Sequence, residues 1–473
     1  MSDGPTVSYA EFRRACSSFR PSELLPYLGR YSAETHGVTK LDSETLKVLP
    51  PWNFATVARE CLLWGKDDVP GYRVNQRAVA RLFNLLRDVS HYEEDPTLAE
   101  IVTPLIHDQF PYQGDTFTDM ARAVAVLGTT WDEFPEWDWT KVFGLTLPDM
   151  IRATSVLLVA ASIGGKVDLD KFWDPRIDEE LAPREHVEKA LAFLTRTPEE
   201  HRAAAAKAGV LVETAGQYDY NPLRDRPFVD FGPGTGIVAP EPRLVWRAIS
   251  IQNLYYVGPD YFGPKAFHEQ LGKRLESYVG RQLRLIDGAD VTGEVPLDSE
   301  NKMSIDWFLV LPDLIVLVEC KSARLNAKAL AGDAHEIARA TTMYLAKARD
   351  QIDATARKVR ECDKRVSFLP DDDRPVVGLI VTAEPIHLAN SGQVEYGRQG
   401  ETLSIVLSLA DLEGLVGVPT AELSSRLAGV FQDEERRTWG FPQSFGKGLE
   451  AWRNPIIVEA KNRFAFLRDQ SDD

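Results

Sequence analysis

Apolar residues recur every three to four positions through most of the first half of the chain, from Pro21 to about Ala208. This spacing is typical of amphipathic helices, and Pro, Gly and Asp separate the apolar segments as they do between helices. Residues 74–89, VNQRAVARLFNLLRDV, are a clear example. We therefore expect residues 1–217 to form an all-helical N-terminal domain.

The pattern breaks in residues 218–250, where Pro and Gly are frequent. Neither residue sits comfortably inside a helix or a central strand. We expect this segment to be a connector between two domains.

Beyond the connector the periodicity alternates between that of helices and that of strands. The pattern predicts helices at 264–282 and 333–360 and strands at 304–310, 314–322, 375–383 and 403–409. Helices flanking a mixed sheet define an α/β domain, which we expect over residues 251–415. Residues 416–473 would then be a C-terminal extension.

Two apolar runs joined by Leu-Pro-Asp, in SIDWFLVLPDLIVLVECKSARL, predict a β-hairpin. If its loop is the four residues 311–314, Asp306 faces Glu319 and Phe308 faces Leu317. The two-residue alternation of a strand also places Lys321 on that face. A three-residue loop would shift the pairing and separate these groups.

Two neighbouring carboxylates repel each other unless a proton or a cation lies between them. Oxygen ligands of this kind suit Mg²⁺, or Mn²⁺, which could polarise a phosphodiester and lower the pKa of a bound water. Lys321 could orient that water or stabilise the charge that develops on phosphorus. The alternative is an exposed Asp, Glu and Lys cluster that contributes little stability.

Asp306 and the Glu319-Cys320-Lys321 triplet, on consecutive strands before a long helix, resemble the core of the PD-(D/E)XK nuclease superfamily. The segment GPKAFHEQLGKRLESYVGRQL also resembles the opening helix of its restriction-type members, through Gly272, Leu275, Glu276, Tyr278 and Val279. The later segment VVGLIVTAEP fits the fourth element of that core. Ile305 stands where the family usually has Pro.

The resemblance implies a restriction-endonuclease-like fold and a role for each matching residue. Asp306 and Glu319 would bind the metal, with the backbone carbonyl of Cys320 as a further ligand. Lys321 would be the catalytic base or position the water. Glu276 would join them, although it also fits a solvated helix face.

The chain carries a net charge of −17, so contact with nucleic acid has to be local. Residues 321–365 hold 11 Lys and Arg against 6 Asp and Glu. Arg324, Lys328 and Lys347 are candidate phosphate contacts there. Gln351 resembles a position that lies near metal or substrate in some relatives, and a solvated surface remains the alternative for all four.

The start of the chain has no apolar signal segment, which indicates a cytoplasmic protein. The most apolar stretch, residues 153–165, is too short to span a membrane, so no membrane partner is expected. Four scattered cysteines without metal-ligand spacing favour free thiols and no zinc site.

We therefore expect a metal-dependent nuclease, with DNA as the favoured substrate, of the kind that serves bacterial restriction or antiviral defence. The N-terminal domain would act as a sensor or regulator that binds a protein partner or a ligand. Two alternatives stay open: a nonhydrolytic module that binds nucleic acid or protein on the same fold, and an RNase. Whether the chain forms a homo-oligomer also stays open.

Overall fold

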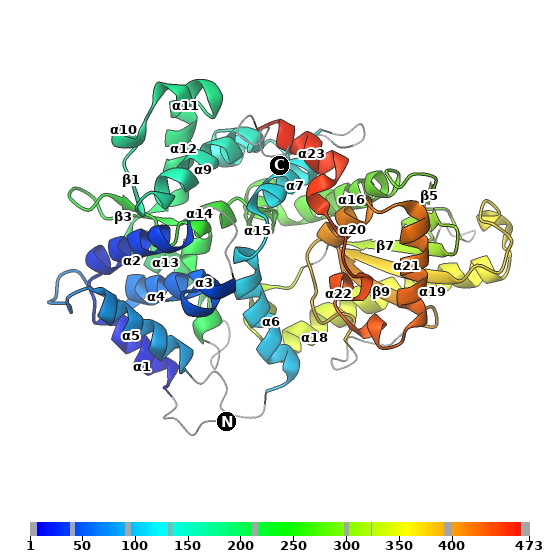
Figure 1. Cartoon of the computed structure of the whole chain (residues 1–473), viewed down its shortest axis with the longest axis horizontal. Coiled ribbons are helices and arrows are strands. Elements are labelled where there is room, and N and C mark those ends of the chain that lie inside the picture. The colour runs from blue at the N-terminus through cyan, green and yellow to red at the C-terminus, as the bar shows by residue number, and fades with distance from the viewer. Residues whose placement is uncertain are drawn as a thin grey trace. The chain divides into compact units, whose positions relative to one another are not determined.

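The computed structural model describes residues 7–37, 43–89, 96–130, 134, 136–210, 216–297, 302–322, 324–391 and 400–464. The chain folds into two compact units, both of which combine helices with a sheet (Figure 1). The first comprises Met1–Pro96, Pro104–Tyr261 and Ala460–Asp473, and the second comprises Thr97–Thr103 and Phe262–Glu459. The units are described separately below.

Helices make up most of the first unit. They are α1 (Tyr9–Ser17), α2 (Pro21–His36), α3 (Ser43–Val48), α4 (Pro51–Trp64), α5 (Gln76–Arg87), α7 (Thr116–Leu127), α8 (Thr140–Phe143), α9 (Leu147–Ser162), α10 (Leu169–Phe172), α11 (Pro175–Glu180), α12 (Arg184–Leu194), α13 (Pro198–Ala208), α14 (Arg243–Arg247) and α15 (Ile251–Phe262). The chain passes between the units just before and within α6 (Leu98–Gln109), at the last residue of α15, and within α23 (Pro455–Asn462).

The core of the first unit lies where α1, α2, α4 and α5 pack together. Phe12, Leu28, Phe54 and Leu82 each contribute a buried side chain from one of these helices. The ring of Phe54 meets the edge of the Phe83 ring at a centroid distance of 4.8 Å. Burial of these apolar faces accounts for the helical periodicity of the sequence.

The first unit is not all-helical, which corrects the expectation from the sequence. Four short strands form a sheet in the order β1-β4-β3-β2. They are β1 (Lys166–Val167), β2 (Thr195–Arg196), β3 (Phe228–Asp230) and β4 (Ile237–Val238). Strands of two or three residues carry too few positions to show a two-residue alternation in the sequence.

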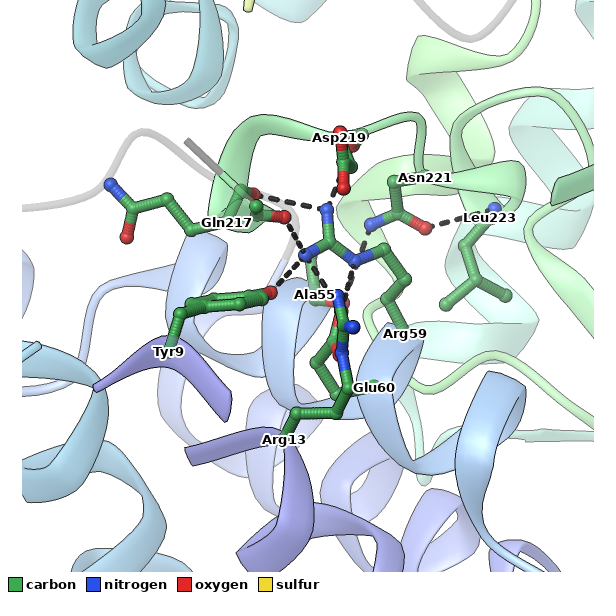
Figure 2. Close-up of polar contacts among 10 residues, drawn as sticks. Tyr9, Arg13, Ala55, Arg59, Glu60, Gln217, Asp219, Asn221 and Leu223 are labelled. Atoms are coloured by element: carbon green, nitrogen blue, oxygen red, sulfur yellow. Dashed lines mark hydrogen bonds and ion pairs between the residues drawn. The ribbon is translucent and has the colours of Figure 1, made fainter. Parts of the chain in front are cut away.

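Residues 218–250 lie within the first unit rather than between the units. Figure 2 shows contacts that fix the chain where this segment begins: the guanidinium of Arg59, on α4, reaches the backbone at Gln217 and Asp219. Arg59 donates hydrogen bonds to the carbonyls of Gly216, Gln217 and Asp219 at 2.8, 3.0 and 2.8 Å. It also pairs with Glu60 at 2.7 Å. A Pro- and Gly-rich composition indicates irregular backbone, but it does not reveal such burial.

The second unit contains a five-stranded mixed sheet in the order β5-β6-β7-β8-β9. Its strands are β5 (Asp290–Gly293), β6 (Trp307–Val310), β7 (Ile315–Lys321), β8 (Val376–Thr382) and β9 (Ser404–Ser408). The pairings β5–β6 and β6–β7 are antiparallel, whereas β7–β8 and β8–β9 are parallel.

The helices of the second unit flank this sheet. They are α16 (Pro264–Leu283), α17 (Ala327–Leu330), α18 (Ala334–Thr341), α19 (Lys347–Arg360), α20 (Leu409–Leu415), α21 (Thr420–Gln432) and α22 (Phe441–Phe445). A single π-helical turn, Thr342–Ala346, joins α18 to α19, so the helix expected at 333–360 is one helical run with an insertion.

The hairpin register predicted from the sequence is confirmed. Phe308 pairs with Leu317 and Val310 with Ile315, and the amide of Leu311 donates to the carbonyl of Leu314 at 2.9 Å. Leu317 and Phe308 belong to the core that includes Ile352 of α19. Because successive strand residues alternate, their neighbours point to the opposite face, which α16 covers.

The segment expected as a C-terminal extension belongs to the second unit as far as Glu459. The hydroxyl of Ser424, on α21, accepts a hydrogen bond of 2.8 Å from the amide of Asp313 in the hairpin loop. Asn454 donates to the side chain of Gln282 on α16 at 2.6 Å. These contacts tie the segment to both the hairpin and α16.

In the part of the chain that the structure describes, no helix has the length and apolar character needed to cross a bilayer. Cys16, Cys61, Cys320 and Cys362 are all free thiols, as expected from their scattered positions.

Candidate active site

The candidate site lies where the β6–β7 hairpin ends and α19 covers the sheet. The ladder closes with the pair Trp307 and Val318, so the next residues in register are Asp306 and Glu319. Glu319 and Lys321 lie two apart on β7, and their side chains therefore share one face. The structure thus brings Asp306, Glu319 and Lys321 together, as the sequence predicted.

Each of these side chains has a defined hydrogen bond. Asp306 accepts the main-chain amide of Cys320 through Oδ2 at 2.6 Å. Lys321 donates from Nζ to Oε1 of Glu319 at 2.5 Å. It also donates to Oε1 of Gln351, on α19, at 3.0 Å. Lys321 is therefore held between a strand carboxylate and a helix amide.

Burial dominates the electrostatics of the two carboxyl groups. Glu319 is only 2% exposed, and burial, followed by the nearby charge of Asp306, raises its pKa to about 7 although Lys321 opposes the shift. Burial also raises the pKa of Asp306, against the hydrogen bond from Cys320 and the charge of Lys321. For both carboxyl groups, burial outweighs the positive charge of Lys321, so that the protonated forms are favoured relative to water.

One oxygen of this pair has no partner. Oε2 of Glu319 is buried without a hydrogen bond. A buried carboxylate oxygen left in this way is costly unless a ligand satisfies it. The orphaned oxygen and the adjacent Asp306 are hard oxygen donors, and Mg²⁺ takes one or two carboxylates while keeping several waters. The residues present therefore fit this cation.

Among the described residues, no group of three or more His, Cys, Asp or Glu side chains is arranged to hold a metal ion. The candidate set consists of two carboxylates, and water would have to complete an octahedral shell. This excludes a closed, all-protein metal cage within the described residues. It leaves room for the open kind of site that catalysis requires.

Two further residues of the prediction lie differently from the central trio. The thiol of Cys320 is on the opposite face of β7, and burial raises its pKa, with the charge of Glu276 contributing. Glu276 is half-buried on α16, and its carbonyl accepts a hydrogen bond of 2.9 Å from the indole of Trp307. Glu276 therefore approaches from the α16 face, whereas Lys321 and Gln351 meet on the α19 face.

The candidate phosphate contacts divide into buried and exposed residues. Arg324 is buried and forms an ion pair of 2.5 Å with Glu384, which corrects its assignment as a surface contact. Its charge is already neutralised inside the protein. Lys328 on α17 and Lys347 on α19 are exposed, so both remain accessible to a polyanion.

The sequence reasoning missed Glu294, which follows β5. Gly293 pairs with Trp307, so the next residues in register are Glu294 and Asp306. Burial, followed by the charge of Asp306, raises the pKa of Glu294. The signal was weak because Asp290–Gly293 is short and polar, and only the alternating Val291 and Val295 hint at a strand.

No protein-family model matches the chain, and comparisons with curated proteins and with solved structures also yield no match. The functional argument therefore rests on the site itself.

Proposed function

We propose that the second unit is a Mg²⁺-dependent phosphodiesterase that cleaves nucleic acid, with DNA as its preferred substrate. The observation that carries this proposal is the buried, unpartnered Oε2 of Glu319 next to Asp306, with Lys321 held beside them. The resemblance to PD-(D/E)XK nucleases supports the same reading, and a role in restriction or antiviral defence would follow from it.

In this mechanism Asp306 and Glu319 would hold the cation. When bound, Mg²⁺ would supply Lewis acidity, which polarises the phosphodiester and lowers the pKa of a coordinated water. The raised pKa values of both carboxyl groups suit this arrangement, because added positive charge favours their ionised forms.

Lys321 has a separate task. An ammonium group carries three N–H donors, and two of them are committed to Glu319 and Gln351. The third is left for the attacking water or for a phosphate oxygen. Because α19 supplies Gln351, the helix fixes the direction of that third donor. Gln351 is therefore a positioning residue.

The test compares Lys321→Ala and Asp306→Asn with the unmodified protein on plasmid DNA, single-stranded DNA and RNA in the presence of Mg²⁺. We expect both substitutions to lower the single-turnover rate by about a hundredfold or more, since each removes a charge from the reacting centre. Lys265→Ala is the matched control, because Lys265 is an exposed lysine of the same unit that already pairs with Glu269 on α16.

Equal products and rates from Lys321→Ala and the unmodified protein would defeat the mechanism. If cleavage were confined to RNA, the substrate would be RNA rather than DNA. Binding of DNA without Mg²⁺ uptake in calorimetry, and without cleavage, would leave the nonhydrolytic binding module as the function.

A further inference from the structure

The segment from Arg73 to Arg87 has an unusual charge for this protein. Its 15 residues include four arginines and no Asp or Glu, in a chain with 71 acidic and 54 basic residues. Most of the segment forms α5, and the side chain of Asn75 caps the helix by accepting the amide of Ala78 at 2.9 Å.

The two faces of α5 differ sharply. Val79, Leu82, Phe83 and Leu86 are buried in the core of the first unit, where α5 packs against α1 and α4 (Figure 1). The arginines at 73, 77, 81 and 87 are all exposed, as are Tyr72 and Asn84. Because the apolar face is committed to the core, α5 presents only its cationic face to a partner.

Several cations elsewhere on the surface of the first unit pair with nearby acids. The pairs include Arg30 with Glu34, Lys171 with Asp168, Arg176 with Asp174, Arg184 with Glu188, and Lys189 with Glu185. On α5, Arg87 pairs with Asp88 at 3.2 Å. Across the described residues, Arg73, Arg77 and Arg81 have no ion-pair or hydrogen-bond partner.

This arrangement works against the stability of the helix. Arg77 and Arg81 are four residues apart, and like charges at this spacing destabilise a helix by about 0.2–0.5 kcal/mol. Three neighbouring arginines that have no counter-charge among the described residues are complementary to a polyanion. Four helical residues rise about 6 Å, so two flexible arginines can reach neighbouring phosphates on one strand.

We propose that α5 and Arg73 form a docking surface for the phosphate backbone of double-stranded DNA. The choice of DNA as the polyanion rests on the proposed nuclease function, whereas the surface itself is independent of the cleavage site. An anionic membrane is a poorer match, because a helix that lies in a bilayer buries its apolar face there, and that face of α5 is occupied.

The test measures binding of the full chain to a fluorescent DNA duplex by anisotropy, with EDTA present so that no cleavage occurs. The variant combines Arg73→Gln, Arg77→Gln and Arg81→Gln. We expect binding to weaken by about tenfold or more at low salt. The slope of log affinity against log salt concentration should fall by about 2–3, since each lost phosphate contact removes about 0.9.

A second triple variant provides the matched control. Lys171→Gln, Arg176→Gln and Lys189→Gln remove the same charge from exposed residues of the first unit that are already paired. Affinity for DNA should change less than about twofold in this control, because neutralised side chains release few counterions. Circular dichroism confirms that both variants are folded.

Three outcomes would overturn the proposal: unchanged affinity in the α5 variant, equal loss in both variants, or loss of binding to phosphatidylserine vesicles instead of DNA. The two proposals also fail separately. If the protein binds DNA through α5 but never cleaves it with Mg²⁺, the nuclease function fails and the docking surface stands. If the α5 variant binds and cleaves like the unmodified protein, the docking surface fails alone.

Discussion

The surroundings of Glu319 have opposing effects on the pKa of its carboxyl group. Lys321, at 2.5 Å, favours the ionised carboxylate, whereas burial and the charge of Asp306 favour the protonated acid. The second influence prevails, and the pKa rises from 4.5 to about 7. A carboxyl group that is partly protonated near neutral pH is poised to exchange its proton for a cation.

This shift predicts how the stability of the protein depends on pH. An acid with a raised pKa in the folded state binds its proton more tightly there, so folding loses stability as pH rises between 4.5 and about 7. Above that window the loss reaches up to about 3 kcal/mol, because one pKa unit corresponds to about 1.4 kcal/mol. Asp306 acts in the same direction.

Urea unfolding at about pH 5 and about pH 8 in EDTA, for the unmodified protein and Glu319→Gln, measures this effect. In the difference in unfolding free energy between the two proteins, the contributions of the other titrating groups cancel. We expect the free energy of unfolding of Glu319→Gln to rise relative to that of the unmodified protein as pH rises. Mg²⁺ at about pH 8 should reduce this difference. A difference that stays constant between the two pH values would contradict the raised pKa.

At the scale of elements, the sheet approaches α16 closely at Gly280. A Cβ atom added to Gly280 would lie 2.1 Å from Cζ2 of Trp307, the first residue of β6. The absence of a side chain at Gly280 therefore lets the indole pack against the helix. Because Asp306 directly precedes Trp307, this contact also fixes the strand end that carries the site.

We expect Gly280→Ala to lower the free energy of unfolding of the second unit by about 1–3 kcal/mol, since the Trp307 ring has to move and the strand with it. Gly272→Ala is the matched control on the same helix. Its Cβ would lie 3.5 Å from Oγ of Ser322, an ordinary contact, and Ala gains about 0.5–1 kcal/mol over Gly within a helix.

Urea titrations of both variants give the comparison. Equal stabilities for Gly280→Ala and Gly272→Ala would show that α16 does not approach β6 as closely as described.

The residues of the site that lie on or beside long strands with a clear apolar pattern could be predicted from the sequence. The hairpin was predictable because charged residues interrupt two apolar runs only at Asp306, Glu319 and Lys321. The strand β5 was missed because Asp290–Gly293 carries almost no apolar residues, and Glu294 was missed with it. The packing of Gly280 against Trp307 joins residues 27 positions apart and leaves no local pattern.

Burial was the property that the sequence conveyed least well. Arg324 reads as a surface cation until Glu384, 60 residues later, pairs with it inside the protein. Residues 218–250 read as a connector because Pro and Gly indicate irregular backbone whether it is exposed or packed. The hydrogen bond from Arg59 to the carbonyl of Asp219 shows that the start of this segment is packed, and it comes from a helix 160 residues earlier.

At the scale of the whole molecule, the two proposals place different functions in the two compact units of an acidic chain. The carboxylates of the candidate site lie in the second unit. Arg73, Arg77 and Arg81, which have no ion-pair partner among the described residues, lie in the first. A chain with a net charge of −17 repels polyanions in general. Contact with nucleic acid would therefore be confined to cationic surfaces such as α5, Lys328 and Lys347.

Because each unit has its own hydrophobic core, we expect destabilisation of one unit to leave the other largely intact. Arg59→Ala removes one partner of the buried Arg59–Glu60 ion pair, and with it the donor to three backbone carbonyls, at a cost of about 3–5 kcal/mol. Leu317→Ala opens a cavity in the core of the second unit, at a cost of about 2–5 kcal/mol. The two substitutions are therefore expected to lower stability by similar amounts, each in a different unit.

Hydrogen exchange followed by mass spectrometry shows which segments are destabilised, because amides exchange faster wherever the local free energy of opening falls. Arg59→Ala should accelerate exchange in α2 and α4 and leave β7 and β8 unchanged, and Leu317→Ala should do the reverse. If either substitution accelerated exchange equally in both sets of peptides, the units would unfold as one cooperative body. In that case, ligand binding to the first unit would stabilise the Asp306 and Glu319 site directly, through the shared unfolding equilibrium.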